Sequence, residues 1–185
     1  MPAGEDQLGR IDTELEDARR RAHQLTSALD HQRWARRPGP DQWSAAECLI
    51  HLNLASRAFL PLVRDAIATG RRLEQFSPGP YRRDFVGWVL SWIVEPPVRL
   101  RVRTTAPFVP AGVEPRDVVL ATFDALQGEL RTCVADASGL DLVRLRVVSP
   151  FDPRLKYNLY SCLKLIPAHQ RLHLTQAAAA IGPHH

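Results

Sequence analysis

Residues 43–52, which read WSAAECLIHL, contain the sharpest local signal for secondary structure in this chain. Ser44 has the side chain of an N-cap residue, and Glu47, three residues later, completes the Ser-x-x-Glu pattern of a capping box. Trp43 and Cys48 occupy the positions of a hydrophobic staple on either side of the cap. We therefore expect a helix that begins at residue 44, carries an apolar stripe and ends near residue 69.

Three further segments show the three- and four-residue spacing of apolar side chains that is typical of amphipathic helices. They span about residues 6–34, 116–137 and 157–181. Proline and glycine at 38–40 and at 182–183 end the first and the last of them, because neither residue continues a helix easily. Pro61 and Pro167 lie inside two of the expected helices. We expect a kink at each or, at Pro167, the start of a separate helix.

The connection between the second and third helices, residues 70–115, is too long for a simple antiparallel hairpin. A long crossover allows the two helices to run parallel in a bundle. Within it, the apolar segment 84–94 is a short helix candidate. The alternating stretch 98–103 and residues 145–148 are candidate strands, and we interpret both as extended connections. The pattern predicts one all-α domain, residues 1–185, built as a four-helix bundle.

Composition and charge exclude several functional classes. Of the 185 residues, 45% are hydrophobic and 24% are charged, which is typical of a globular domain. The net charge of +4 comes from scattered arginines, whereas a nucleic-acid footprint is clustered, so we expect no nucleic-acid partner. The apolar run 85–94 is too short to span a membrane, and the acidic residues near the N-terminus do not resemble a signal peptide. We expect a cytoplasmic protein without membrane contact, whose cysteines (Cys48, Cys133 and Cys162) are reduced and buried.

His169 and His173 form a His-x-x-x-His pair on the last expected helix. Four residues turn a helix by about 400°, so the two rings are about 40° apart around the axis and roughly 6 Å apart along it. This spacing allows both imidazoles to bind one metal ion. The apolar stripe of the helix directs both rings to the interior, where an unpaired polar group is costly. His51, on a stripe of small and apolar residues after the cap, is the third candidate ligand.

Three neutral imidazoles leave at least one coordination position open for water, as in catalytic metal sites. Zn²⁺ fits such a set best, and Ni²⁺, Fe²⁺ and Mn²⁺ also suit imidazole. We interpret Glu47 as a cap rather than a catalytic base, and Cys48 and Cys162 as small core residues. Gln176 either orients a ligand or a bound water, or is a surface amide. Four other histidines are interpreted as solvated and are excluded from the site: His23, His31, His184 and His185.

Two motifs resemble those of the DinB/YfiT-like superfamily. Residues 43–52 match a Trp-Ser-x-x-Glu-x-x-x-His-Leu opening of its second helix, and residues 169–176 are similar to its C-terminal His-x-x-x-His-x-x-Gln segment. The motifs stand in the expected order with a long connection between them, so the resemblance spans most of the chain. It implies a four-helix bundle of up-down-down-up topology with a divalent metal held by three histidines. By position, these ligands are His51, His169 and His173.

The same resemblance implies a class of activity. Members with assigned activities are mostly transferases or isomerases that use a low-molecular-weight thiol, others are described as metal-dependent hydrolases, and many form homodimers. The resemblance therefore implies a metal-dependent enzyme that activates a thiol or a water and acts on a small-molecule substrate. Crossover arginines are either ligands for carboxylates of the thiol or solvated charges: Arg82, Arg83, Arg99, Arg101 and Arg103. The alternatives are a hydrolase and a non-catalytic dimeric module that binds metal.

Overall fold

The structure is a computed structural model that describes residues 3–95 and 104–182. Its elements in chain order are α1 (Ala3–Thr26), α2 (His31–Ala35), α3 (Ala45–Arg72), α4 (Phe85–Val94), the 3₁₀ turn η1 (Ala106–Phe108), α5 (Arg116–Asp136), β1 (Arg146–Val148), β2 (Lys156–Asn158) and α6 (Leu159–Ile181). The prediction of an all-α chain is confirmed as a mostly helical fold, to which one small two-stranded sheet is added.

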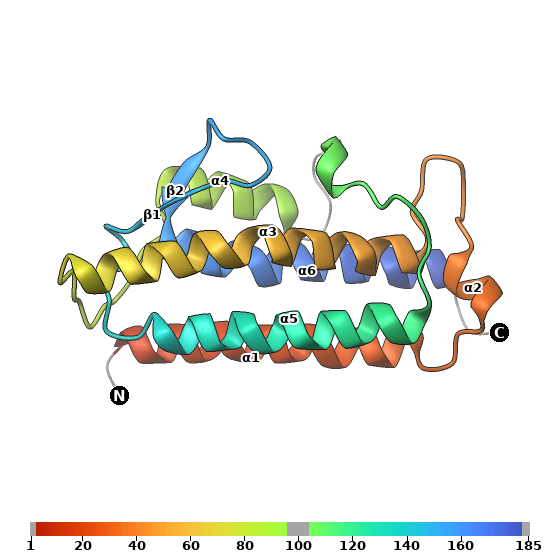
Figure 1. The fold of residues 1–185 in the computed structure, drawn as a ribbon, viewed down its shortest axis with the longest axis horizontal. Coiled ribbons are helices and arrows are strands. Elements are labelled where there is room, and N and C mark those ends of the chain that lie inside the picture. Colours follow the sequence, from red (N-terminus) through yellow and green to blue (C-terminus); the bar gives the residue numbers. More distant parts are fainter. Residues whose placement is uncertain (1–2, 96–103, 183–185) are drawn as a thin grey trace.

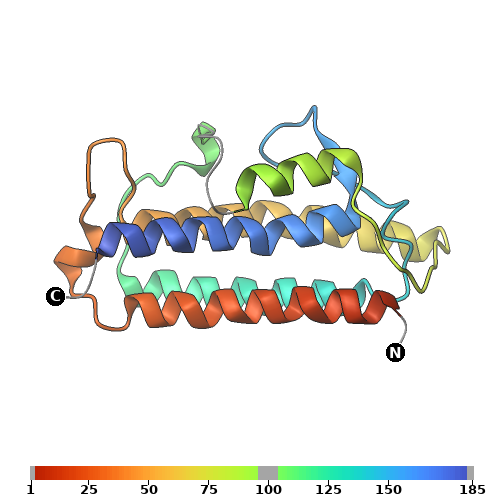
Figure 2. The ribbon, with the colours of Figure 1, turned by 180° about the vertical axis from the view of Figure 1, so that it is seen from behind.

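Four long helices, α1, α3, α5 and α6, lie side by side along the long axis of the molecule (Figure 1). The helices α1 and α3 each pack against both α5 and α6. The chain runs in one direction in α1 and α6 and in the opposite direction in α3 and α5 (Figures 1 and 2). The long connection between α3 and α5 supplies the chain length that their parallel course requires.

Helix α3 begins at the predicted capping box. The Ser44 hydroxyl accepts a hydrogen bond from the Glu47 backbone N–H at 3.2 Å, and the Glu47 carboxylate accepts one from the Ser44 N–H at 2.9 Å. The helix continues beyond Gly70 to Arg72. Leu145 packs closely against Gly70, where an added Cβ atom would lie 2.7 Å from Leu145 Cδ1. The cap thus fixes the start of α3, and a close tertiary contact lies near its end.

The first predicted helix, residues 6–34, is wrong in its extent because the chain forms two helices there. After α1 ends at Thr26, Asp30 caps α2 by accepting a backbone N–H hydrogen bond at 2.7 Å. The Arg116 side chain donates to the carbonyl oxygens of Thr26 and Leu29. These carbonyls belong to the end of a helix and the turn after it, where internal partners are lacking. A side chain from α5 therefore stabilises the break.

The interpretation of residues 145–148 as an extended connection is also wrong. Strand β1 pairs antiparallel with β2, and the central side chain of each strand is buried. Because β2 uses the residues with which the predicted helix 157–181 begins, α6 starts only at Leu159. The other candidate strand, 98–103, lies outside the described residues.

Two prolines lie within helices without ending them. Helix α3 continues through Pro61 and α6 through Pro167, which excludes a separate helix at Pro167. The apolar segment 84–94 forms α4, as predicted, and α4 packs on α6 (Figure 2). Gly87 of α4 faces Ser161 of α6 so closely that an added Cβ atom would lie 2.1 Å from the Ser161 hydroxyl oxygen. The absence of a side chain at Gly87 therefore allows α4 to pack closely on α6.

The core of the protein consists of two clusters of buried apolar side chains. Phe59 and Leu15 belong to one cluster, and Trp34 and Phe123 belong to the other; all four are at most 1% exposed. The three cysteines are buried and form no disulfide, as expected. None of the described helices combines the length and the hydropathy needed to cross a bilayer.

Candidate metal centre

The side chains of His51, His169 and His173 meet where α3 packs against α6. His169 Nε2 lies 3.2 Å from His51 Nε2 and 3.0 Å from His173 Nε2. One ring nitrogen from each residue lies within 4.8 Å of the other two. Across residues 3–95 and 104–182, this is the only group of three or more histidine, cysteine or acidic side chains arranged to hold a metal ion. The structure thus brings together all three histidines that the sequence singles out.

The spacing of these nitrogen atoms fits a bound metal ion. Two imidazole nitrogens at about 2.0–2.1 Å from Zn²⁺, at a tetrahedral angle, are about 3.4 Å apart. The observed Nε2 separations of 3.0 and 3.2 Å are close to this value. Lone pairs that converge at such distances repel one another unless a proton or a cation lies between them. A divalent cation is therefore chemically suited to this set of donor atoms.

The crossover sets the orientation of His51. The Phe108 carbonyl oxygen, at the end of η1, lies 2.8 Å from His51 Nδ1. Because a carbonyl oxygen only accepts, Nδ1 carries the proton and Nε2 presents its lone pair to the other two rings. A backbone carbonyl in this position is a common support for metal-binding histidines. Sequence reasoning missed Phe108, because the contact uses the main chain of a connecting segment and leaves no pattern of side chains.

Burial keeps the three imidazoles uncharged. His51 is 1% exposed and His173 is 7% exposed, and His169 has intermediate exposure. Burial lowers the pKa of His51, and burial together with the other two rings lowers the pKa of His169 well below its ordinary value. Burial and the neighbouring His51 lower the pKa of His173 to about 3. All three rings are therefore neutral near pH 7, and neutral imidazole is the form that binds metals.

Aromatic rings surround the three imidazoles. The Trp43 ring centre lies 5.0 Å from that of His51. Trp43 is also stacked on His173, with the ring centres 5.7 Å apart. Phe151, in the loop between β1 and β2, lies 5.5 Å from the His169 ring. Trp43 belongs to the motif 43–52, whereas Phe151 was not predicted from the sequence. These rings give the nitrogen atoms an apolar surrounding, in which electrostatic interactions are stronger than in water.

Residues 14–177 match the family model of the DinB superfamily. The chain belongs to this superfamily. The matched region covers well over half of the chain and includes both histidine motifs, so the resemblance inferred from those motifs is confirmed. Neither the curated proteins nor the solved structures contain a match.

In this DinB-superfamily chain, Glu47 and Cys48 lie on the helix of His51 but outside the cluster. The Glu47 carboxylate accepts hydrogen bonds from Ser44 and Arg37, and these outweigh burial and lower its pKa. Burial raises the pKa of the Cys48 thiol to about 12. Glu47 thus acts as a cap and Cys48 as a core residue. Among the described residues, no carboxylate or thiol completes the coordination set formed by the three imidazoles.

Two side chains of α6, His173 and Gln170, have buried polar atoms that lack partners within the described chain. His173 Nδ1 is buried without a well-formed hydrogen bond, although the half-buried Gln176 side chain is near enough to raise the pKa of the ring. Both amide atoms of Gln170 are also buried without a partner. Buried polar groups are normally satisfied by protein or water. Besides the three Nε2 atoms, His173 Nδ1 is therefore a further polar atom of the cluster that still lacks a well-formed hydrogen bond.

The remaining histidines lie outside the cluster. His23 is paired with Asp124 at 2.9 Å, and His31 is exposed at the start of α2. Residues 184 and 185 are outside the described part of the chain.

Proposed function

We propose that this member of the DinB superfamily is a metal-dependent enzyme in which a divalent ion, bound by His51, His169 and His173, activates a small thiol or a water molecule. Zinc is the proposed metal, with nickel, iron and manganese as the alternatives that imidazole also accepts. The proposed reaction class is thiol-dependent transfer or isomerisation, and metal-dependent hydrolysis is the alternative.

The observation that carries this proposal is the convergence of three neutral imidazoles in a set that no other described side chain closes. A structural zinc site normally has four protein ligands, whereas a catalytic site has three and keeps a position for a reactant. This difference favours an enzyme over a module that holds metal for stability alone. A divalent ion lowers the pKa of an attached thiol or water and so supplies a nucleophile near neutral pH.

The residues around the imidazoles would keep the site ready for such chemistry. The Phe108 carbonyl holds His51 in the tautomer whose Nε2 is free. Trp43 fixes the ring planes of two histidines from one side, and Phe151 packs beside the third. Because all three rings are uncharged before an ion binds, no proton has to be removed from them near pH 7.

A surface cavity between α3 and the crossover is the proposed place for the apolar part of a small-molecule substrate. Its volume is about 330 Å³, and it is lined by Ile50 and Leu54 of α3 and by six crossover residues: Pro107, Val109, Ala111, Gly112, Val113 and Glu114. Ile50 and Leu54 stand before and after His51 in the sequence of α3, and the wall residues Pro107 and Val109 are the chain neighbours of Phe108. Binding in this cavity would therefore place a substrate next to the segment that orients His51.

Further features of the proposal follow from the family. We propose that the four long helices form its up-down-down-up bundle as a single domain, that the protein is a homodimer and that it acts in the cytoplasm. The three free, buried cysteines support a reducing environment. The proposed thiol is a low-molecular-weight compound such as glutathione, bacillithiol or mycothiol.

The metal site is tested first. The wild-type protein, His169→Ala and the control His23→Ala are purified without an affinity resin that carries metal, and their metal content is measured by elemental analysis. We expect about one divalent ion per chain in the wild type and in His23→Ala, and none in His169→Ala. The control is matched because His23 pairs with Asp124 outside the cluster. Equal metal content in all three proteins would remove the site from this position.

The reaction class is tested second, with the metal-loaded wild type. Conjugation of glutathione, bacillithiol and mycothiol to a panel of electrophiles is compared with hydrolysis of esters and amides. Thiol conjugation that is lost in His169→Ala supports the transferase. Hydrolysis without conjugation selects the hydrolase. Bound metal without either reaction would leave the non-catalytic module.

A further inference from the structure

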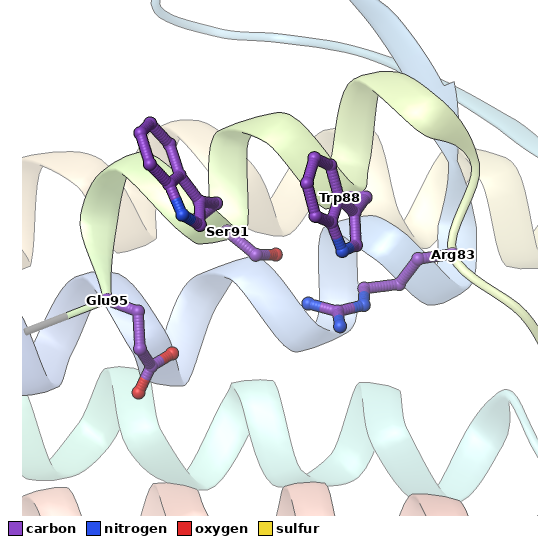
Figure 3. A pocket seen from close by; sticks show the side chains of 5 residues that line it. Arg83, Trp88, Ser91 and Glu95 are labelled. Carbon is purple, nitrogen blue, oxygen red and sulfur yellow. The ribbon is translucent and has the colours of Figure 1, made fainter.

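A second pocket lies along α4. It has a volume of about 250 Å³ and is lined by Arg83, Trp88, Ser91, Trp92 and Glu95. In Figure 3 the Arg83 guanidinium extends below the Trp88 ring, toward the side of the helix that carries Ser91 and Glu95. The Trp88 side chain is 51% exposed and Trp92 is 43% exposed. Large aromatic side chains that stay this accessible beside a cavity are a frequent mark of a binding surface.

The pocket carries one positive charge that no described residue neutralises. Glu95 accepts three hydrogen bonds from Arg171 at 2.8–3.0 Å, so its negative charge is already compensated. Arg171 and Lys164 share Glu14, which completes a network of two acidic and two basic side chains. In contrast, Arg83 forms no hydrogen bond and no ion pair within residues 3–95 and 104–182. The charge that remains for a ligand is therefore positive.

This pocket is distinct from the candidate metal centre. Arg171, which binds the Glu95 carboxylate, stands two residues from both His169 and His173 on α6. Two residues correspond to a turn of about 200° around a helix, so Arg171 projects from the side of α6 opposite to the two imidazoles. The pocket and the imidazoles thus lie on opposite sides of α6, and a ligand in one does not need the other.

We infer that this pocket binds a small aromatic or apolar carboxylate, whose anionic group pairs with Arg83 and whose ring packs against the indole of Trp88. Guanidinium recognises carboxylates through paired N–H donors, and indole rings offer broad apolar faces for a ligand ring. The Ser91 hydroxyl donates to the Gly87 carbonyl at 2.8 Å, so its proton is used within α4 and Arg83 is the donor that remains for the carboxylate. The site requires neither the metal nor the reaction proposed above.

The shape of the pocket favours a small molecule over a lipid surface. Exposed aromatic rings beside arginine are also found where proteins touch anionic membranes. Here, however, the rings and the guanidinium line a concave space of about 250 Å³. A membrane-facing surface requires no such cavity. We therefore assign the pocket to a soluble carboxylate.

The inference is tested by isothermal titration calorimetry with 2-naphthylacetate and its uncharged analogue 2-naphthylacetamide. The proteins are the wild type, Arg83→Gln, Trp88→Ala, His169→Ala and the control Arg82→Gln. Arg82 is the exposed neighbouring arginine and does not line the pocket. We expect the wild type to bind one equivalent of 2-naphthylacetate and to bind the amide at least about tenfold more weakly. Circular dichroism melting establishes that each variant is folded.

The variants separate the outcomes. Affinity for 2-naphthylacetate should fall about tenfold or more in Arg83→Gln and Trp88→Ala and remain unchanged in Arg82→Gln and His169→Ala. Equal affinity in wild type and Arg83→Gln, or loss of binding in His169→Ala, would overturn the inference. Absence of binding to the wild type would overturn it too. Vesicles of phosphatidylglycerol provide the last arm: binding to them without binding of 2-naphthylacetate would replace the proposed ligand by a lipid surface.

Discussion

The two sides of α6 hold their polar side chains in opposite ways. On the side that meets α3, His169 and His173 are uncharged, lie near aromatic rings and have only another imidazole close to their Nε2 atoms. On the side that meets α1 and α4, the polar side chains are charged and half-buried, and they bind one another. These are Lys164 and Arg171 of α6, Glu14 of α1 and Glu95 next to α4.

This difference shows which side is complete without a ligand. Every charge of the ion-pair network has a partner of opposite sign within 3.0 Å, so the network needs nothing further. The Nε2 atoms of His51 and His173 lie 3.2 and 3.0 Å from His169 Nε2, and a cation among the three rings would accept a lone pair from each. We therefore expect the ion-pair side to contribute stability by itself, and the imidazole side to contribute it through a bound metal.

The largest expected effect is the stabilisation of the protein by zinc. At a free concentration about 1,000 times its dissociation constant, a ligand raises the free energy of unfolding by about 4 kcal/mol. We expect this increase in the wild type and its absence in His173→Ala. Arg171→Ala, two residues away on the other side of α6, should keep it. Urea denaturation with and without zinc measures the effect, and equal gains in the two variants would abolish the contrast between the two sides.

The second effect is a loss of stability of the metal-free protein as the pH falls from 6.5 to 5. The folded pKa values of His51, His169 and His173 are depressed, so protons bind first to the unfolded chain, whose imidazoles titrate near 6.5. Each such group costs at most about 1.4 kcal/mol per pH unit below that value, and we expect about 3 kcal/mol in total. Urea denaturation in the presence of a chelator measures the loss.

Glu14, in the ion-pair network on the other side of α6, is the comparison for this pH dependence, because in the unfolded chain it titrates at a lower pH than the histidines. Burial of Glu14 would raise its pKa, but hydrogen bonds from Lys164 and Arg171 outweigh this and lower it. Its contribution is therefore lost only as the pH falls below about 4.5, the value in the unfolded chain. His169→Leu should make the dependence between pH 6.5 and 5 less steep. An unchanged slope in that variant would show that other groups cause it.

The features that could be predicted from the sequence are those set by local chemistry. The start of α3 was predicted because the capping box of Ser44 and Glu47 uses only neighbouring residues. The histidine cluster was predicted because four-residue spacing places His169 and His173 on one face of a helix, and because His51 follows the cap on an inward stripe.

The features that were missed depend on residues distant in the chain. The break after Thr26 lies within a periodic apolar stretch and is stabilised by Arg116 from another helix. Strand β2 exists because it pairs with β1, and pairing of this kind leaves little signal in three residues. Likewise, Phe108 and Phe151 reach the imidazoles from connecting segments. Their contacts follow from the path of the folded chain and not from a motif.

The third effect is the contribution of the ion-pair network to stability. Arg171→Ala removes hydrogen bonds to Glu14 and Glu95, and because its side chain is 33% exposed, solvent reduces the cost to about 1–2 kcal/mol. Arg64→Ala is the matched control, since the Arg64–Glu129 pair is 54% and 43% exposed and should contribute about 0.5 kcal/mol or less. Chemical denaturation at pH 7 measures both. Similar values for the two variants would show that partial burial adds nothing to the network.

The smallest expected effect concerns Cys48, which decides whether the imidazole side is closed by a thiolate. Cys48 lies one turn before His51, is fully buried, and has a pKa raised by burial to about 12. A metal-bound thiolate would require the Cys48 thiol to lose its proton, whereas a thiol in the core keeps it.

We expect no alkylation of Cys48 by iodoacetamide in the folded protein at about pH 8, and complete alkylation in urea. We also expect Cys48→Ala to retain the zinc content of the wild type. Mass spectrometry and elemental analysis make both measurements. Loss of zinc from Cys48→Ala, while the variant still shows the wild-type circular dichroism, would mean that the imidazole side is a closed structural site with four ligands.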